Sequence, residues 1–181
     1  MPDTIPEFKE WTKIARLSRD CVITEKIDGT NAQIFITEDG QIFTGSRTRW
    51  ITPQNDNFGF AKWVEQRKDE ILKMGPGRHF GEFWGLGIQR GYDLFERRFS
   101  LFGRIVAKEV PNCVTIVPTL YEGVFDTEKI GQVLQTLVEY GSKAAPNYMN
   151  PEGIVIFHKA SGQLFKKTIK DDEVPKGVSN V

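Results

Sequence analysis

The pattern of hydrophobic and polar positions along the chain predicts a fold built largely from β-strands. Short runs rich in apolar, aromatic and β-branched residues, which are typical of strands, occur at residues 21–24, 32–37, 41–44, 79–84, 101–109, 114–120, 153–158 and 163–169. Asp39-Gly40 lies between the second and third runs, and Ala160-Ser161-Gly162 lies between the last two. Both are turn sequences typical of hairpins, so at least two pairs of neighbouring strands are expected to be antiparallel.

Two segments have the different spacing of amphipathic helices. Residues 58–74 carry apolar side chains near helical spacing and end before Gly75-Pro76-Gly77, which favours a helix with a clear stop. Residues 127–140 place their apolar side chains on one face and end at Gly141. Residues 86–100 are expected to form a loop, residues 1–20 receive no assignment, and the polar tail from Asp171 is expected to be loose.

Together these elements predict a single α+β domain over residues 1–181, with antiparallel sheets and flanking helices. No repeat or linker-like stretch divides the chain. Its composition, with 39% hydrophobic and 27% charged residues, is ordinary for a globular protein. The 17 Gly, 13 Phe and nine Pro favour strands and tight turns over a helical bundle.

Charge and rare residue types exclude several functional classes. The formal net charge of +0 gives no general nucleic-acid signal, although a local basic groove remains compatible with it. Cys21 and Cys113 lie far apart, which favours free thiols over a single disulfide, and only two His argue against a His-rich metal site. The N-terminus does not resemble a signal peptide, and no apolar run approaches about 18 residues. A cytoplasmic protein without a membrane partner is expected.

The candidate chemistry begins at Glu25-Lys26-Ile27-Asp28-Gly29, directly after the first predicted strand. Taken alone, such a segment is more often an exposed turn with a solvated Lys. Its chemical interpretation is a nucleophilic amine on a turn. A Lys becomes nucleophilic when desolvation or neighbouring cations favour its neutral form, and Gly29 would allow the backbone to approach a nucleotide closely.

The rest of the chain supplies, in order, the groups that an amine attacking ATP would need. Cations are required on the phosphates, carboxylates are required for a divalent metal, and the base and ribose must be held. Candidates follow at Ser46-Arg47, Glu82, Phe102, Glu152 and Lys166-Lys167. Each alone has an ordinary structural explanation, such as a core Phe or the solvated Lys of an edge strand. Their order gives them weight.

This ordered set resembles the covalent nucleotidyltransferase superfamily of polynucleotide ligases and mRNA capping enzymes, and within it the RNA ligase 2 type. The resemblance covers residues 21–169 and implies an ATP-grasp-like adenylation domain without an OB domain. It implies that Lys26 carries AMP and that Glu25 contacts the adenine amino group. The other implied nucleotide-binding roles fall to Ile27 within the lysine motif, Asn31 in phosphate chemistry, Arg47 at the ribose or nucleic-acid end, and Phe102 stacked on adenine.

The resemblance also implies the catalytic and metal-binding groups. Glu82 and Glu152 would bind Mg²⁺ or Mn²⁺, and Lys166 would contact the α-phosphate and favour the neutral form of Lys26. The second Lys of this last motif normally follows after one intervening residue. Here Thr168 occupies that place and Lys167 is adjacent to Lys166. Neighbours on a strand point to opposite faces, so which of the two Lys acts stays open.

The implied activity is an ATP-dependent RNA ligase. Lys26 would take AMP from ATP, pass it to a polynucleotide 5′-phosphate, and seal that end to a 3′-hydroxyl. Arg90, Arg97 and Arg98 are candidates for contacting the polynucleotide backbone. About a dozen residues follow Thr168, so either a partner protein supplies an end-binding module or this domain acts alone. A DNA nick-sealing ligase and a non-catalytic nucleotide- or nucleic-acid-binding module are the alternatives.

Overall fold

A computed structural model describes residues 5–173 and contains two β-sheets. The four-stranded sheet has the order β10-β9-β1-β8, and all of its neighbours are antiparallel. Its strands are β1 (Asp20–Lys26), β8 (Thr119–Val124), β9 (Gly153–His158) and β10 (Gln163–Thr168). The first strand along the chain therefore lies in the middle of this sheet, between strands formed about 100 and 130 residues later.

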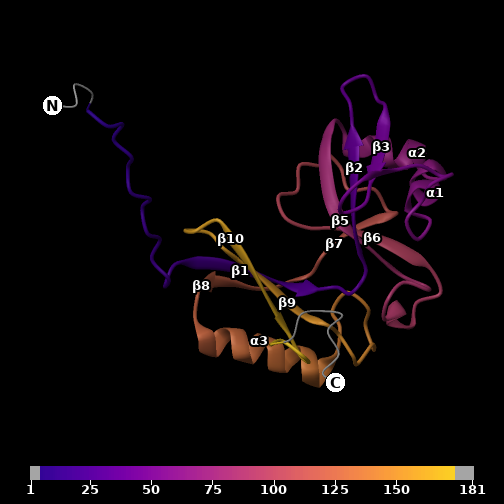
Figure 1. Cartoon of the computed structure of the whole chain (residues 1–181). Helices are drawn as coiled ribbons and strands as arrows, with labels where there is room; N and C mark the ends of the chain where they lie inside the picture. The colour runs from indigo at the N-terminus through magenta and orange to yellow at the C-terminus, as the bar shows by residue number, and fades with distance from the viewer. Residues whose placement is uncertain (1–4, 174–181) are drawn as a thin grey trace, which may run out of the picture.

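The six-stranded sheet has the order β4-β3-β2-β5-β6-β7. Its strands are β2 (Thr30–Ile36), β3 (Ile42–Gly45), β4 (Trp50–Ile51), β5 (Gly77–Gly85), β6 (Arg97–Leu101) and β7 (Val114–Ile116). The β6–β7 pair is parallel and the other pairs are antiparallel. Figure 1 shows this sheet beside α1 and α2, and the four-stranded sheet above α3. The predicted α+β class with mainly antiparallel sheets is confirmed.

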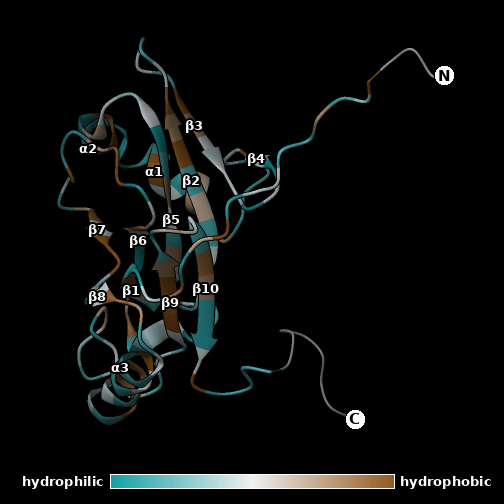
Figure 2. Cartoon of the chain, turned by 90° about the vertical axis from the view of Figure 1, so that its left-hand side faces the viewer, coloured by the Kyte–Doolittle hydropathy of each residue, from teal (hydrophilic) through white to brown (hydrophobic). Residues whose placement is uncertain are grey.

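Each sheet buries one face against helices. In the four-stranded sheet, Cys21, Ile23, Ile154 and Ile156 pack with Ile130 and Leu137 of α3 (Thr127–Tyr140). In the six-stranded sheet, Ile34, Phe83 and Phe99 pack against Phe60 and Trp63 of α1 (Phe60–Glu65). Figure 2 shows both brown hydrophobic and teal hydrophilic segments in the strands, as expected for sheets that cover a core with one face.

A third cluster packs beside the turn that joins β1 to β2. It contains Ile27, Trp84, Tyr92, Val117 and Tyr148, all of which are at most 9% exposed. These residues come from the turn after β1, from β5 and from three later loops. The chain thus connects the two sheets through packed side chains around the segment that follows Lys26.

The predicted helix over residues 58–74 is broken into α1, α2 (Lys68–Ile71) and a 3₁₀ turn (Leu72–Met74). The break follows from Arg67. Its backbone N–H bonds the Val64 carbonyl three residues earlier, and its guanidinium stacks 4.6 Å over the Trp63 ring and donates to the Trp63 carbonyl. These bonds replace the i→i−4 ladder, so the helix stops. The predicted stop at Gly75 and the helix over 127–140 are confirmed.

Two strand predictions are wrong in their bounds. The strand expected over 101–109 is β6, which begins inside the expected loop at Arg97 and ends at Leu101, shortly before Gly103 turns the chain with φ 72°. The strand expected over 114–120 is divided at Pro118, so β7 and β8 belong to different sheets. Pro118 has no N–H for a ladder bond, and its carbonyl accepts the Glu25 N–H of β1 instead. The short strand β4 had not been predicted.

Among residues 5–173, no helix is long and apolar enough to span a bilayer. For residues 1–20 the sequence predicted no element. In the structure β1 begins at Asp20, and residues 5–16 are exposed and belong to no helix or strand. The tail expected to be loose lies mostly outside the described residues.

Candidate active site

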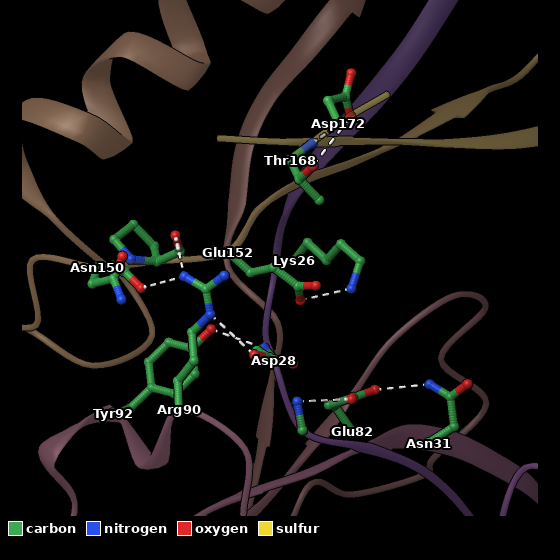
Figure 3. A network of polar contacts seen from close by, with 12 residues as sticks. Lys26, Asp28, Asn31, Glu82, Arg90, Tyr92, Asn150, Glu152, Thr168 and Asp172 are labelled. Carbon is green, nitrogen blue, oxygen red and sulfur yellow. Dashed lines mark hydrogen bonds and ion pairs between the residues drawn. The ribbon is translucent and has the colours of Figure 1, made fainter. Parts of the chain in front are cut away.

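Lys26 is the last residue of β1, and Glu152 directly precedes β9. Lys26 pairs in register with Gly153, which places the two side chains at the same end of neighbouring strands. The Lys26 Nζ donates to Glu152 Oε2 at 2.7 Å (Figure 3). The Lys26 side chain is 24% exposed, whereas that of Glu152 is 7% exposed. The amine therefore has access from outside and a nearly buried carboxylate beside it.

Glu82 supplies a second carboxylate from β5 of the other sheet. Its Oε1 accepts the Gly29 N–H at 3.1 Å, and its Oε2 accepts the Asn31 side-chain amide at 2.8 Å (Figure 3). Burial raises the pKa of Glu82 to about 7. Asn31, Lys26 and Gly29 favour its ionised form, and the nearby charge of Glu152 disfavours it. Lys26 and both carboxylates are thus close enough to interact electrostatically.

Gly29 explains how the turn after Lys26 lies so close to β5. A Cβ atom at this position would lie 2.5 Å from the Phe83 carbonyl oxygen and 2.7 Å from the Trp84 Cβ. Any other residue would push the turn away from the strand and lengthen the Gly29–Glu82 hydrogen bond. The glycine predicted to permit a close approach to nucleotide is required here for a close approach to β5.

Asp28 is fixed by two residues of the loop between β5 and β6. The Asp28 N–H donates to the Tyr92 hydroxyl at 2.8 Å, and Arg90 Nε donates to Asp28 Oδ2 at 3.0 Å. Arg90 Nη1 also donates to the carbonyls of Asn150 and Pro151, directly before Glu152 (Figure 3). Burial raises the pKa of Tyr92, so its hydroxyl stays protonated. Arg90 therefore joins the segment after Lys26 to the segment before Glu152.

This arrangement changes the prediction for the three arginines. Arg90 was expected to contact the polynucleotide backbone, but its guanidinium bonds protein atoms. Arg97 donates to the carbonyls of Leu86 and Phe58, and Arg98 pairs with Glu96. Sequence reasoning missed the positioning roles of Arg90 and Tyr92. The only local signal was an aromatic and arginine-rich loop with several Gly.

The strand register determines which Lys of β10 shares a face with Lys26. Thr168 pairs with Gly153, which pairs with Lys26, so Thr168 and Lys26 lie in one row. Lys166 is two residues from Thr168 and therefore on the same face, whereas Lys167 is on the opposite face. Lys167 Nζ bonds Asp172 at 3.1 Å. A Cβ at Gly153 would collide with the Lys167 carbonyl, so this glycine allows β10 its position.

Glu25 lies on the other face of β1 and is 2% exposed. Its carboxylate accepts the Ser142 hydroxyl at 2.6 Å and the N–H groups of Lys143 and Ala144, both at 2.9 Å. A carboxylate has about four acceptor positions, so three are already used. The predicted contact with adenine would require this carboxylate to share or release these bonds.

The remaining predicted residues fall into two places. Ile27 is buried in the third cluster, and the half-buried ring of Phe102 packs against the same cluster. Arg47 is exposed beyond the end of β3 and forms no hydrogen bond or ion pair with residues 5–173. The predicted roles of these residues toward a nucleotide stay predictions.

The carboxylate oxygens of Glu82 and Glu152 are suitable ligands for Mg²⁺ or Mn²⁺. Within the described ranges, no group of three or more His, Cys, Asp or Glu gathers as a metal cage. This composition fits an ion that keeps waters and takes further ligands from substrate phosphates, since Mg²⁺ commonly binds through one or two carboxylates.

Comparison with known proteins assigns the chain to a family. The model of the RNA ligase family matches residues 19–170, which include both sheets and every predicted site residue. The chain belongs to the RNA ligase family. In this member of the RNA ligase family, the Lys26–Gly29 turn and the carboxylates of Glu82 and Glu152 lie together.

Solved RNA ligases share the fold. An RNA ligase variant of Naegleria gruberi with ATP and Mn has a TM-score of 0.59 and 18% identity, over 92% of this chain and 58% of that chain. The Naegleria gruberi RNA ligase with PPi has a TM-score of 0.57 and 19% identity, over 91% and 57%. A variant of the Naegleria gruberi enzyme without ligand has a TM-score of 0.58 and 19% identity, over 91% of this chain and 57% of that chain. This chain thus spans a little over half the length of these relatives.

Proposed function

We propose that this chain is the adenylylating core of an ATP-dependent RNA ligase, with Lys26 as the nucleophile. The observation that carries the proposal is the pairing of Lys26 Nζ with Glu152 at 2.7 Å, beside the second carboxylate of Glu82. A partly exposed amine next to two carboxylates from different sheets suits attack on a metal-bound nucleotide phosphate. Family membership supports the same chemistry.

In the proposed first step, the neutral Lys26 amine attacks the α-phosphorus of ATP. An N–P bond forms, the bond from the α-phosphorus to the bridging oxygen breaks, and pyrophosphate leaves. The attacking nitrogen gives up one proton, for which the Glu152 carboxylate is the adjacent acceptor. Glu152 Oε2 orients the amine, and the exposed Lys166 on the same face is the candidate cation for the phosphate charge. A divalent ion held by Glu82 and Glu152 would neutralise phosphate charge when bound.

In the later steps, AMP passes from Lys26 to a 5′-phosphate end of RNA, and a 3′-hydroxyl then displaces AMP. ATP, a divalent metal and an RNA end are therefore the proposed ligands. Support for ATP and manganese comes from the Naegleria gruberi structures, which were solved with ATP and Mn. The family favours RNA over the alternative of a DNA nick. We also propose that a partner protein assists the binding of RNA ends.

The test is covalent labelling. Protein incubated with α-labelled ATP and Mg²⁺ or Mn²⁺ should acquire an acid-labile, alkali-stable label, as a phosphoramidate does. Lys26→Ala and Lys26→Arg should both abolish it, while Lys62→Ala, at an exposed Lys of α1, should leave it unchanged. Absence of label with every divalent metal would refute the proposal. Label from GTP alone would move the assignment to a capping-type guanylyltransferase.

The substrate is tested separately, with pre-adenylylated ends. Sealing of nicks with RNA on the 3′-hydroxyl side should exceed sealing of the matched all-DNA nick. Equal or better sealing of DNA would favour the DNA nick-sealing alternative. Binding of the adenylylated end without any sealing would favour the non-catalytic module.

A further inference from the structure

The outer face of the six-stranded sheet carries aromatic rings that no part of the described chain covers. Phe43, Trp50 and Phe80 are 43%, 50% and 47% exposed. Large aromatic side chains on a sheet normally bury most of their area. These three belong to the strands β3, β4 and β5, which lie in the same sheet with β2 between β3 and β5.

Strand register puts these rings on one face. Gln33 pairs with Phe80 on one side and with Gly45 on the other, and Gly45 pairs with Trp50. In the next row, Phe35 pairs with both Phe43 and Arg78. Directly paired residues and those two apart share a face. The rings therefore lie in two neighbouring rows that cross β4, β3, β2 and β5, the strands of Figure 2.

The ring of Phe43 contacts those of Phe35 and Trp50, and an arginine lies over these last two rings. The centroids of Phe35 and Phe43 are 6.4 Å apart, and those of Phe43 and Trp50 are 6.0 Å apart. The Arg78 guanidinium lies 4.9 Å from the Phe35 ring and 5.4 Å from the Trp50 ring, and it also donates to the Gln33 side chain. The face thus has a fixed positive charge over connected aromatic rings.

A hollow opens beside Trp50 and Arg78. It holds about 290 Å³ and is lined by Gln33, Arg47, Thr48, Arg49, Trp50 and Arg78. That volume is near the lower limit of small-ligand pockets, roughly 300 Å³, so it suits one planar ring rather than a whole nucleotide triphosphate. Arg49 is held by the carbonyls of Asn55 and Asp56, whereas Arg47 has no partner among residues 5–173 and is available to a ligand.

The same face continues directly into the candidate active site. Glu82 pairs with Asn31, and Phe80 and Arg78 follow on β5 at two-residue intervals. Each interval advances about 6.6 Å along a strand, which is close to the spacing of successive nucleotides. A strand of RNA ending at Glu82 would therefore pass over Phe80 and reach Arg78 and Trp50.

We propose that this face, defined by Phe43, Trp50, Phe80 and Arg78, binds unpaired bases of the RNA strand whose end is being joined. Exposed rings stack on bases of any sequence, and Arg side chains pair with phosphates or stack on bases. Bases inside a duplex are already stacked and do not present their faces to a flat sheet. The proposal rests on the proposed function for the identity of its substrate, but its binding surface is separate from Lys26.

The test measures anisotropy of a labelled single-stranded ten-nucleotide oligo(A) RNA against the full chain, with unlabelled duplex RNA as competitor. Trp50→Ala and Phe80→Ala should each weaken binding by about fivefold or more, because stacking on one ring contributes that much to affinity. Arg78→Lys should weaken it less than Arg78→Ala. Phe95→Ala removes an aromatic ring that is 96% exposed at another place and should bind as wild type does.

Two outcomes would overturn the proposal. Unchanged affinity of the Trp50 and Phe80 variants would do so, provided their thermal midpoints match that of wild type. Competition by duplex RNA equal to that by the single strand would also do so. Lys26→Ala protein should bind the oligonucleotide as wild type does. Failure of adenylylation and failure of this surface therefore give different results.

Discussion

Thr168 and Lys26 lie opposite the same residue, Gly153, in neighbouring strand pairs of the four-stranded sheet. Thr168 therefore lies in the same row and on the same face of the sheet as Lys26. In the families that this sequence resembles, a second Lys occupies the position of Thr168. Lys166 shares that face, and Lys167 does not.

This register predicts an asymmetry between the two Lys of β10. Lys166→Ala should lower the rate of Lys26 adenylylation by about a hundredfold, as the loss of one preorganised charge commonly does. Lys167→Ala should change it by less than about threefold, because the Lys167 side chain starts from the other face of β10 and bonds Asp172. Single-turnover labelling with α-labelled ATP measures both. A larger effect at Lys167 would mean that β10 has a different register.

A gain of function is expected at Thr168. Thr168→Lys would add a cation in the row of Lys26 and should lower the KM for ATP in adenylylation by a few-fold, about 1 kcal/mol of electrostatic stabilisation. Lys170→Thr is a matched control near the end of β10 and should leave the KM unchanged. A raised KM at Thr168→Lys would show that the row has no space for phosphate.

The pKa of Glu82 predicts how stability depends on pH. Its pKa is about 7 in the folded chain, against 4.5 for an ordinary Glu, so between these values the folded state holds a proton that the unfolded state releases. The unfolded state then binds fewer protons, and the free energy of unfolding falls as pH rises through this window, by roughly 3 kcal/mol.

Glu82→Gln removes this titration. The measurement is urea unfolding between pH 5 and pH 8 without divalent ions. The free energy of unfolding of wild type, minus that of Glu82→Gln, should fall as the pH rises and should stop changing above pH 7. A difference that stays constant or grows in favour of wild type would contradict a raised pKa.

Arg90 is expected to be a positioning residue. Arg90→Ala removes its bonds to Asp28 and to the carbonyls of Asn150 and Pro151, and should lower the free energy of unfolding by about 2–3 kcal/mol. Arg90→Lys should recover only part of this lost free energy of unfolding, because an ammonium group cannot span these acceptors as a guanidinium does. Arg104→Ala, at an exposed Arg without such bonds, should be neutral. If the free energy of unfolding of Arg90→Ala equals that of wild type, a positioning role for Arg90 is excluded.

Glu25 offers a test between holding a loop and contacting adenine. Glu25→Gln should destabilise the fold by about 1–3 kcal/mol, because two backbone N–H groups and the Ser142 hydroxyl converge on its carboxylate. If Glu25 affects ATP binding by holding the loop at residues 142–144, then Ser142→Ala should raise the KM for ATP as Glu25→Gln does. A raised KM in Glu25→Gln alone would favour direct contact with adenine.

Local structure and the order of the chemical groups follow from the amino-acid sequence alone. The turn sequence Asp39-Gly40 and the caps of α3, Asp126 and Gly141, act within a few residues. Their effect on local structure can therefore be predicted from the sequence pattern. The Lys26–Gly29 segment and the later carboxylates also have a fixed order along the chain. That order allowed the family to be inferred before any contact was known.

Which of these groups meet depends on how distant strands pair in the folded chain. Lys26 and Glu152 are separated by 126 positions, and their pairing depends on β1 being inserted between β8 and β9. The pKa of Glu82 depends on burial, and the choice between Lys166 and Lys167 depends on register, which hydrogen bonds between distant strands fix. The aromatic face depends on register too, because Phe80, Phe43 and Trp50 reach one face only when β4, β3, β2 and β5 pair.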